Sequence, residues 1–262
     1  MARRRALSTA ALAATAALVV SAAPAHAANP SYVALGDSYS SGTGTRSYIS
    51  DGTSCLRSVY AYPSLIASAK GYDLNFRACS GAKIVDVSNT QLSALSNCNG
   101  AIDKAQAYVN QTLPGALNTL YANIKARAPQ AKVTVVGYPR IFNGVDCNLL
   151  TWFSSSEMTR LNAMADLVNS TTRARATAAG FSFADPTTPF VGHAVCSSSE
   201  WINGLSNPIQ ESYHPNRTGQ ASGYTPTVSP YLTGSTVTAT AALLTTAKGS
   251  TKRLADQQKR YA

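Results

Sequence analysis

Short apolar runs alternate with longer segments of helical spacing along this chain of 262 residues. Apolar runs of strand length lie at residues 32–35, 72–76, 132–137 and 181–185. Apolar residues recur every three or four positions, as on one face of a helix, over residues 59–70, 101–128 and 154–180. Pro114 predicts a kink or a break in the second of these helices. Alternating strands and helices are typical of parallel βαβ units, so the pattern predicts an α/β domain.

The first 27 residues have the pattern of an export signal. Three arginines precede an Ala/Leu/Val run, and Ala25-His26-Ala27 matches a cleavage site. No later stretch reaches the roughly 18 apolar residues of a membrane helix, so we expect a secreted protein without a stable membrane anchor. Removing the signal takes away three arginines and no acidic residue, which lowers the net charge from +10 to +7. Such a basic surface suits anionic partners or simply keeps the protein soluble.

The C-terminal end differs in composition from the rest of the chain. Residues 233–247 are small and apolar, and residues 248–262 carry five basic side chains against Asp256. We therefore divide the exported chain into one domain at residues 28–232 and a C-terminal segment at residues 233–262. That segment could be a helix broken at Gly249, but we favour a solvated basic tail, because charge-rich chain ends are often disordered.

A candidate nucleophile follows the first expected strand. Gly-Asp-Ser-Tyr-Ser-Ser-Gly occupies residues 36–42, so Ser38 lies just past a strand end. The carboxyl ends of parallel strands form the edge of a sheet at which sites are built. The motif is not the Gly-x-Ser-x-Gly elbow of α/β-hydrolases, because Ser40 stands where that elbow needs glycine.

Serine is a weak nucleophile unless a base lies within hydrogen-bonding distance, and the chain has three histidines. His26 leaves with the signal. His193 lies three residues before Cys196, and we expect it to be structural or to line a pocket. His214 is therefore the candidate base. Asp37 is expected to stabilise a turn rather than to act as the acid of a triad.

Four segments together make the chain resemble the SGNH (GDSL-type) esterase and lipase family, in particular its secreted, disulfide-bonded bacterial lipases. The likeness runs from about residue 31 to about residue 226. It is carried by the motif at 36–42, Ala-Cys-Ser-Gly-Ala at 78–82, Val-Gly-Tyr-Pro-Arg at 136–140 and Ser-Tyr-His-Pro at 212–215. The resemblance implies a three-layer α/β/α fold around a flavodoxin-like parallel sheet. It also implies that Ser38 is the nucleophile, that His214 is the base, and that the backbone amides of Ser38 and Gly81 bind the oxyanion.

Export permits disulfides, and the chain has five cysteines, an odd number. The sequence alone allows many pairings. The resemblance implies that Cys55 pairs with Cys79 and that Cys147 pairs with Cys196. Cys98 corresponds to half of a third family bridge whose other half is missing here, so we expect Cys98 to be a free thiol.

Two groups are candidates for orienting the His214 imidazole. The usual acid of the family is an aspartate three residues before the histidine, and Glu211 occupies that position here. In the lipases that this chain resembles, the backbone carbonyl two residues before the histidine can take this role. That carbonyl belongs to Ser212, and we favour it, with Glu211 as the alternative.

One block of the family is missing from the sequence. The family has a Gly-x-Asn-Asp segment on a central strand, and its Asn side chain completes the oxyanion hole. The block should lie between Gly81 and the helix near Ala101, but Asn89, Asn97 and Asn99 lack its flanking residues. Residues 84–87 could mimic a strand there. We expect that the central strand, the oxyanion Asn and the partner of Cys98 were lost together.

These features predict a secreted serine esterase or lipase that hydrolyses carboxylic esters through an acyl-enzyme and is weakened by the missing block. The alternative is a catalytically inactive exported protein of the same fold that binds acyl or glycan ligands. The expected substrate is a lipid or an acylated polysaccharide, and the expected state is a monomer that binds no nucleic acid. No Cys-x-x-Cys or His-Glu-x-x-His pattern supports a metal, and we expect no cofactor.

Overall fold

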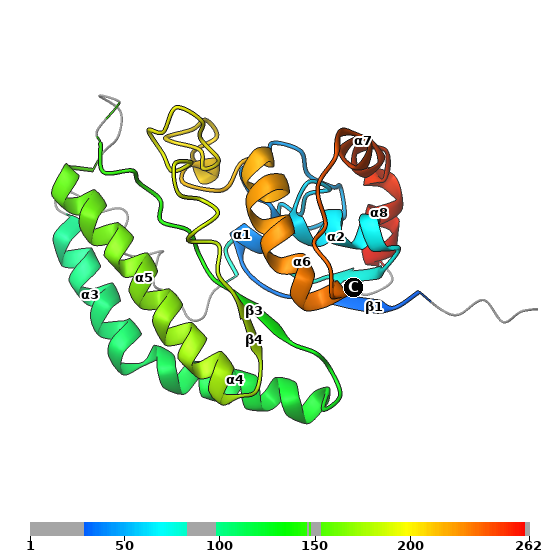
Figure 1. Ribbon diagram of the computed structural model, residues 1–262, viewed down its shortest axis with the longest axis horizontal. Helices are drawn as coiled ribbons and strands as arrows, with labels where there is room; N and C mark the ends of the chain where they lie inside the picture. Colours follow the sequence, from blue (N-terminus) through cyan, green and yellow to red (C-terminus); the bar gives the residue numbers. More distant parts are fainter. Residues whose placement is uncertain (1–28, 83–97, 146, 148–152, 260–262) are drawn as a thin grey trace, which may run out of the picture.

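A computed structural model describes residues 29–82, 98–145, 147 and 153–259 (Figure 1). Its strands are β1 (Ser31–Ala34), β2 (Asp73–Phe76), β3 (Thr134–Val136) and β4 (Ser182–Ala184). They form two parallel pairs, β1 with β2 and β3 with β4. The strands lie where the apolar runs predicted them, and their parallel order agrees with the expected α/β fold.

Within the described ranges, no strand joins the β1–β2 pair to the β3–β4 pair. The strands of the described ranges thus form two separate parallel pairs, and the missing central strand stays a prediction. Residues 84–87, the segment that could mimic this strand, lie outside the described residues.

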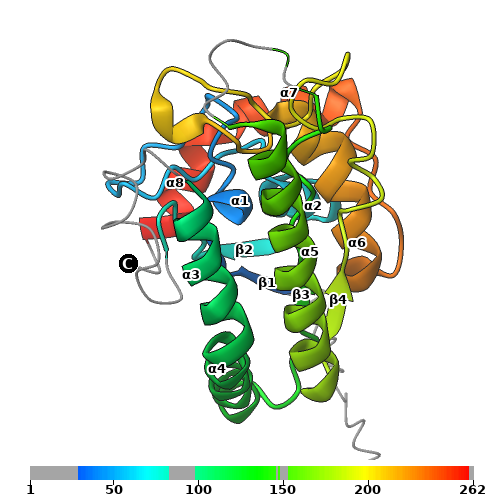
Figure 2. The ribbon, with the colours of Figure 1, turned by 90° about the vertical axis from the view of Figure 1, so that its left-hand side faces the viewer.

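The helices pack on two sides of the strands. On one side lie α3 (Cys98–Gln111), α4 (Leu113–Arg127) and α5 (Ser155–Ala178), as Figure 2 shows. On the other side lie α2 (Tyr62–Lys70), α6 (Thr225–Thr233), α7 (Ala241–Gly249) and α8 (Thr251–Lys259) (Figure 1). The remaining short elements are α1 (Ser38–Ser41), the 3-10 turn Ile209–Glu211 and the π-helix Gly219–Tyr224.

Local sequence signals explain where two of the helices begin. The expected helix over 101–128 is two helices, because Pro114 occupies the first turn of α4, where its missing N–H costs nothing. Ser154 and Glu157 form a capping box at the start of α5, each side chain accepting from the backbone of the other residue. The buried side chains of α4 and α5 then pack together against Val135 of β3.

The C-terminal segment is two packed helices, so the expectation of a solvated tail is wrong for residues 241–259. Leu254 and Ala255 belong to the core that surrounds β1 and β2. The buried side chain of Gln258 accepts from Phe76 N at 2.8 Å and donates to Leu74 O at 2.9 Å. Among the described strands β2 pairs only with β1, so backbone groups on its other edge need partners, and Gln258 supplies them together with Gln257, which also donates to Leu74 O.

Two disulfides join loops that are far apart in the chain. Cys55 is bonded to Cys79, and Cys147 to Cys196, which are the pairings that the resemblance implied. Cys98 begins α3. Its free thiol stays a prediction. Among the described helices, none combines the length and the apolar character needed to cross a membrane.

Candidate active site

Ser38 is placed by a tight turn that follows β1. Gly36 has a φ of +139°, and a Cβ there would lie 2.5 Å from Ser40 Oγ, so only glycine fits. Asp37 then caps α1, and its Oδ1 accepts from Tyr39 N at 3.0 Å. The Gly-Asp-Ser sequence thus ends the strand and begins a helical turn with Ser38 as its first residue.

The structure brings His214 against Ser38 across 176 residues of sequence. His214 Nε2 lies 2.7 Å from Ser38 Oγ, and His214 Nδ1 lies 2.8 Å from the carbonyl oxygen of Ser212. A carbonyl only accepts, so Nδ1 carries the proton and Nε2 is left to accept from the serine hydroxyl. This is the arrangement that a general base for Ser38 requires.

The surroundings keep the imidazole neutral. Burial lowers the pKa of His214 below its ordinary value, although the Ser212 carbonyl and the charges of Asp37 and Glu211 oppose this shift. Part of the burial comes from Tyr39, whose ring centroid lies 5.3 Å from that of His214. A neutral imidazole can take a proton, so the direction of the shift suits a base.

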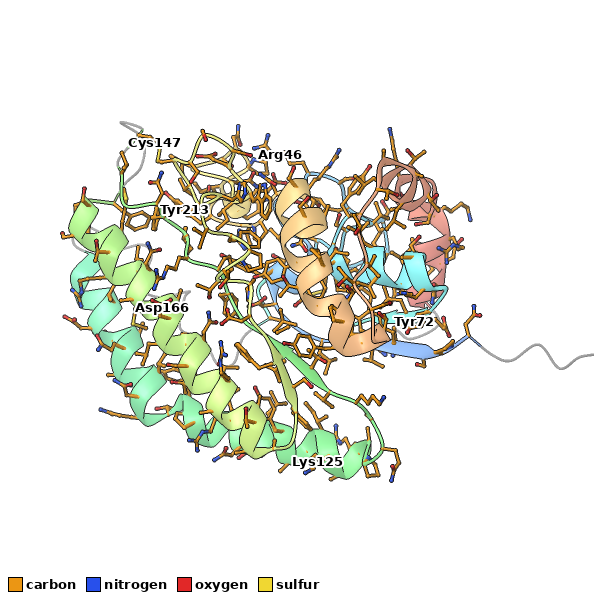
Figure 3. All side chains as sticks on the ribbon, viewed as in Figure 1. Arg46, Tyr72, Lys125, Cys147, Asp166 and Tyr213 are labelled. Atoms are coloured by element: carbon orange, nitrogen blue, oxygen red, sulfur yellow. A yellow bond between two sulfur atoms is a disulfide. The ribbon has the colours of Figure 1, made fainter. Side chains whose placement is uncertain are left out.

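The Glu211 carboxylate is bound to other partners than the imidazole. It is buried and accepts from Tyr48 Oη at 2.5 Å and from Arg46 Nε at 3.0 Å. The Ser212 carbonyl occupies the Nδ1 position instead. Of the two candidates, the structure therefore favours Ser212, because Arg46 and Tyr48 draw the carboxylate to another loop. Figure 3 labels Arg46 and Tyr213 in this loop region, above α1 and β3 in the view.

His193 lies apart from this arrangement. Its Nδ1 is 2.8 Å from Ser199 O, and its ring stacks on Trp201 at 3.7 Å between centroids. Both contacts are compatible with the structural role, one of the two roles expected for this histidine.

Gly81 lies in a loop that is tied to the Ser38 turn. Cys79 N donates to Gly36 O at 3.0 Å, and Ser80 N donates to Cys55 O at 2.8 Å. Gly81 has a φ of +79°, which favours glycine. These bonds hold the loop beside the turn. Most of the interval in which the Gly-x-Asn-Asp block was sought, residues 83–97 of 82–100, lies outside the described residues, and Asn99 lies in α3.

Sequence reasoning missed the role of Tyr138. Its hydroxyl donates to Asp37 Oδ2 at 2.5 Å, and its ring packs edge-on against Tyr39 at 5.1 Å. Burial and the nearby Asp37 carboxylate raise the pKa of Tyr138 well above its ordinary value. The only signal in the sequence was that Tyr138 lies in the Val-Gly-Tyr-Pro-Arg segment, which carries the resemblance without indicating a contact.

Known proteins resemble this chain in both sequence and structure. The chain is 40% identical to a lipase of Streptomyces rimosus over 227 residues, covering 74% of this chain and 84% of the relative. It is 41% identical over 228 residues to Lipase 1 of Streptomyces coelicolor, with the same coverage. The extracellular lipase of Streptomyces rimosus matches the structure with a TM-score of 0.69 and 39% identity, covering 79% of this chain and all of that one.

A phospholipase A1 from Streptomyces albidoflavus also matches, with a TM-score of 0.68, 36% identity and coverage of 77% of this chain and 98% of that one. The alignment with the Streptomyces rimosus lipase runs over 227 positions. The part of this chain that it covers, 74% of 262 residues, is shorter than 227 residues. That relative therefore has aligned positions without a counterpart here, as a deletion would leave.

The family model described as GDSL-like Lipase/Acylhydrolase matches residues 34–221, which include Ser38, Gly81 and His214. The chain belongs to the GDSL-like lipase/acylhydrolase family.

Proposed function

We propose that Ser38 and His214 carry out the hydrolysis of carboxylic esters by this member of the family. The observation that carries the proposal is the 2.7 Å distance between Ser38 Oγ and His214 Nε2, with Nδ1 held on the Ser212 carbonyl. A serine paired with an oriented, neutral imidazole is the arrangement that activates a hydroxyl as a nucleophile. The family and the lipase names of the relatives support an ester as the substrate.

The reaction proceeds in two halves. Ser38 Oγ attacks the ester carbonyl carbon while His214 Nε2 takes the hydroxyl proton. The tetrahedral intermediate then expels the alcohol, which receives that proton from His214. Water attacks the resulting acyl-enzyme with His214 again as the base, and this step releases the acid and restores Ser38.

The oxyanion is bound in this proposal by the backbone amides of Ser38 and Gly81. A third donor, the Asn side chain of the missing block, has no counterpart in the sequence. Loss of one such donor costs about a hundred- to a thousandfold in turnover, or roughly 2.7–4 kcal/mol. We therefore propose an enzyme of reduced turnover.

The substrate is proposed to be a lipid ester, with an acylated polysaccharide as the alternative. The names of the relatives, lipase and phospholipase A1, support the lipid. The signal-like residues 1–27, the two disulfides and the extracellular relative support secretion. The proposed active form is a monomer comprising residues 28–262.

The second candidate function is ligand binding without turnover. The Asn missing from the sequence favours it, because its loss removes support from the oxyanion site, and no strand of the described ranges joins the two strand pairs. Labelling with a fluorophosphonate separates the two functions, since only an activated serine reacts. We expect labelling of the unmodified protein and none of Ser38→Ala, and only slow labelling of His214→Ala. A folded wild-type protein that is not labelled would favour the binding function.

A further inference from the structure

Two loops meet at the Ser38–His214 pair and are closely packed against each other. The loop after α1 contains Gly44, and the second loop runs from Asn203 to His214. A Cβ on Gly44 would lie 2.9 Å from both Asn203 Nδ2 and His214 Cβ. Asn203 Nδ2 donates to Gly44 O at 3.0 Å and to Glu211 O at 3.2 Å. The first loop, which follows Ser38, is thus packed directly against the loop that carries His214.

The Glu211 carboxylate makes a second connection between these loops. It is 2% exposed, and its two oxygens accept from Tyr48 and Arg46, both in the loop after α1. Burial and the hydrogen bond to Glu211 raise the pKa of Tyr48 to about 12, so its hydroxyl stays protonated and donates. Neither oxygen of this buried charge is left without a donor.

Backbone strain lies on both sides of this connection. Arg46 has a φ of 54° and Tyr213 a φ of 60°, in the left-handed region that disfavours residues with a side chain. Tyr213 is held there because its N donates to Asn203 O at 2.9 Å and its O accepts from Tyr39 Oη at 2.8 Å. Strain of this kind gathers at functional sites, where the surrounding contacts fix one geometry.

We propose that Glu211 is a positioning residue, which holds the His214 loop at hydrogen-bonding distance from Ser38 by binding Tyr48 and Arg46. The inference rests on the proposed function of Ser38 and His214. Glu211 directly precedes Ser212, whose carbonyl orients the imidazole, so a shift of Glu211 moves both that carbonyl and His214. The carboxylate positions His214 through the backbone, because its oxygens bind Tyr48 and Arg46 and not the imidazole.

The test compares kcat and KM of Tyr48→Phe, Glu211→Gln and the double variant on a short-chain p-nitrophenyl ester. Tyr48→Phe keeps the ring and removes only the hydroxyl. The matched controls are Tyr231→Phe, an exposed tyrosine on α6, and Glu200→Gln, an exposed carboxylate outside the site. Thermal unfolding and the rate of fluorophosphonate labelling are measured for each protein, so that a loss of folded protein is separated from a loss of positioning.

We expect both single variants to lower kcat about ten- to a hundredfold with KM nearly unchanged, since a misplacement of about 1 Å is enough for this. The kcat of the double variant should be about equal to that of the less active single variant, because the two residues act through one contact. The controls should match the wild type. If Glu211 were the orienting acid, Glu211→Gln would cost about 10⁴-fold, as for the aspartate of a serine protease triad, while Tyr48→Phe would stay near wild type.

A loss of about 10⁴-fold in Glu211→Gln with Tyr48→Phe near wild type would overturn the proposal. Wild-type kcat in both variants would overturn it as well. The same assay on Ser38→Ala separates this inference from the proposed function. Loss of activity in Ser38→Ala with unchanged Tyr48→Phe and Glu211→Gln would defeat only the positioning role. Full activity in Ser38→Ala would defeat the proposed function, and with it the inference.

Discussion

The Tyr138 hydroxyl donates to the Asp37 carboxylate and so links the two described strand pairs. Tyr138 follows β3, and Asp37 follows β1 and precedes Ser38. The contact thus joins the ends of two strands that do not pair with each other. We expect Tyr138→Phe to lower the free energy of unfolding by about 1.5–3 kcal/mol, the range for a hydrogen bond to a charged group.

The same variant should also lower turnover, because Asp37 sets the turn that places Ser38. Urea unfolding and ester hydrolysis measure the two effects. The control is Tyr231→Phe, whose ring is exposed. Equal stability and turnover in the two variants would show that the contact does not support the site.

The pH dependence of kcat/KM follows from the buried imidazole. Burial lowers the pKa of His214 in the folded protein, so the neutral base persists below the ordinary histidine value of 6.5. The acidic limb of the kcat/KM profile should therefore have its midpoint below pH 6.5, and activity should fall as His214 is protonated beneath it. His193→Asn should leave this limb unchanged. A midpoint above pH 7, or a limb that moves with His193, would contradict the assignment of the base.

Gln258 of α8 is expected to stabilise β2 through its buried amide. Gln258→Leu keeps the apolar contact and removes the hydrogen bonds to Leu74 O and Phe76 N. The free energy of unfolding should fall by about 1–3 kcal/mol, because the buried Phe76 N loses its partner, whereas Leu74 O keeps a hydrogen bond from Gln257 Nε2 at 3.1 Å. Lys252→Gln on the same helix is the control, since this exposed ion pair contributes about 0–1 kcal/mol. Similar unfolding curves for the two variants would rule out the role of the glutamine.

The five cysteines should give two disulfides and one thiol. Titration of the denatured, unreduced protein should find one reactive group, and peptide mapping should assign it to Cys98. The bridges span 24 and 49 residues, so the chain-entropy estimate gives each about 3–4 kcal/mol of stabilisation. A disulfide that includes Cys98, within the chain or between two chains, would contradict this.

Local signals made part of the structure predictable from the sequence. Pro114 marked the break between α3 and α4, and the Ser154–Glu157 spacing marked the start of α5. These features depend on neighbouring residues, and so they can be read from a short window. The positions of Ser38 and His214 could be inferred only from motifs that occur together.

Contacts between distant segments were not predictable in the same way. Gln258 meets the edge of β2 from 182 residues away, and nothing in the basic composition of the C-terminal end indicated this. The partners of Glu211 are Arg46 and Tyr48, also far away in sequence. The three-residue spacing from Glu211 to His214 therefore suggested an orienting role that the tertiary contacts do not support.

The measurement that bears most directly on the reaction is turnover of the purified chain without residues 1–27, beside the lipase of Streptomyces rimosus. Short-chain p-nitrophenyl esters are used, with Ser38→Ala of this chain as the control. We expect hydrolysis that depends on Ser38, with kcat about a hundred- to a thousandfold below that of the relative, the cost of one missing oxyanion donor. Hydrolysis that persists in Ser38→Ala would contradict the assigned nucleophile, and a wild-type kcat equal to that of the relative would contradict the weakened oxyanion site.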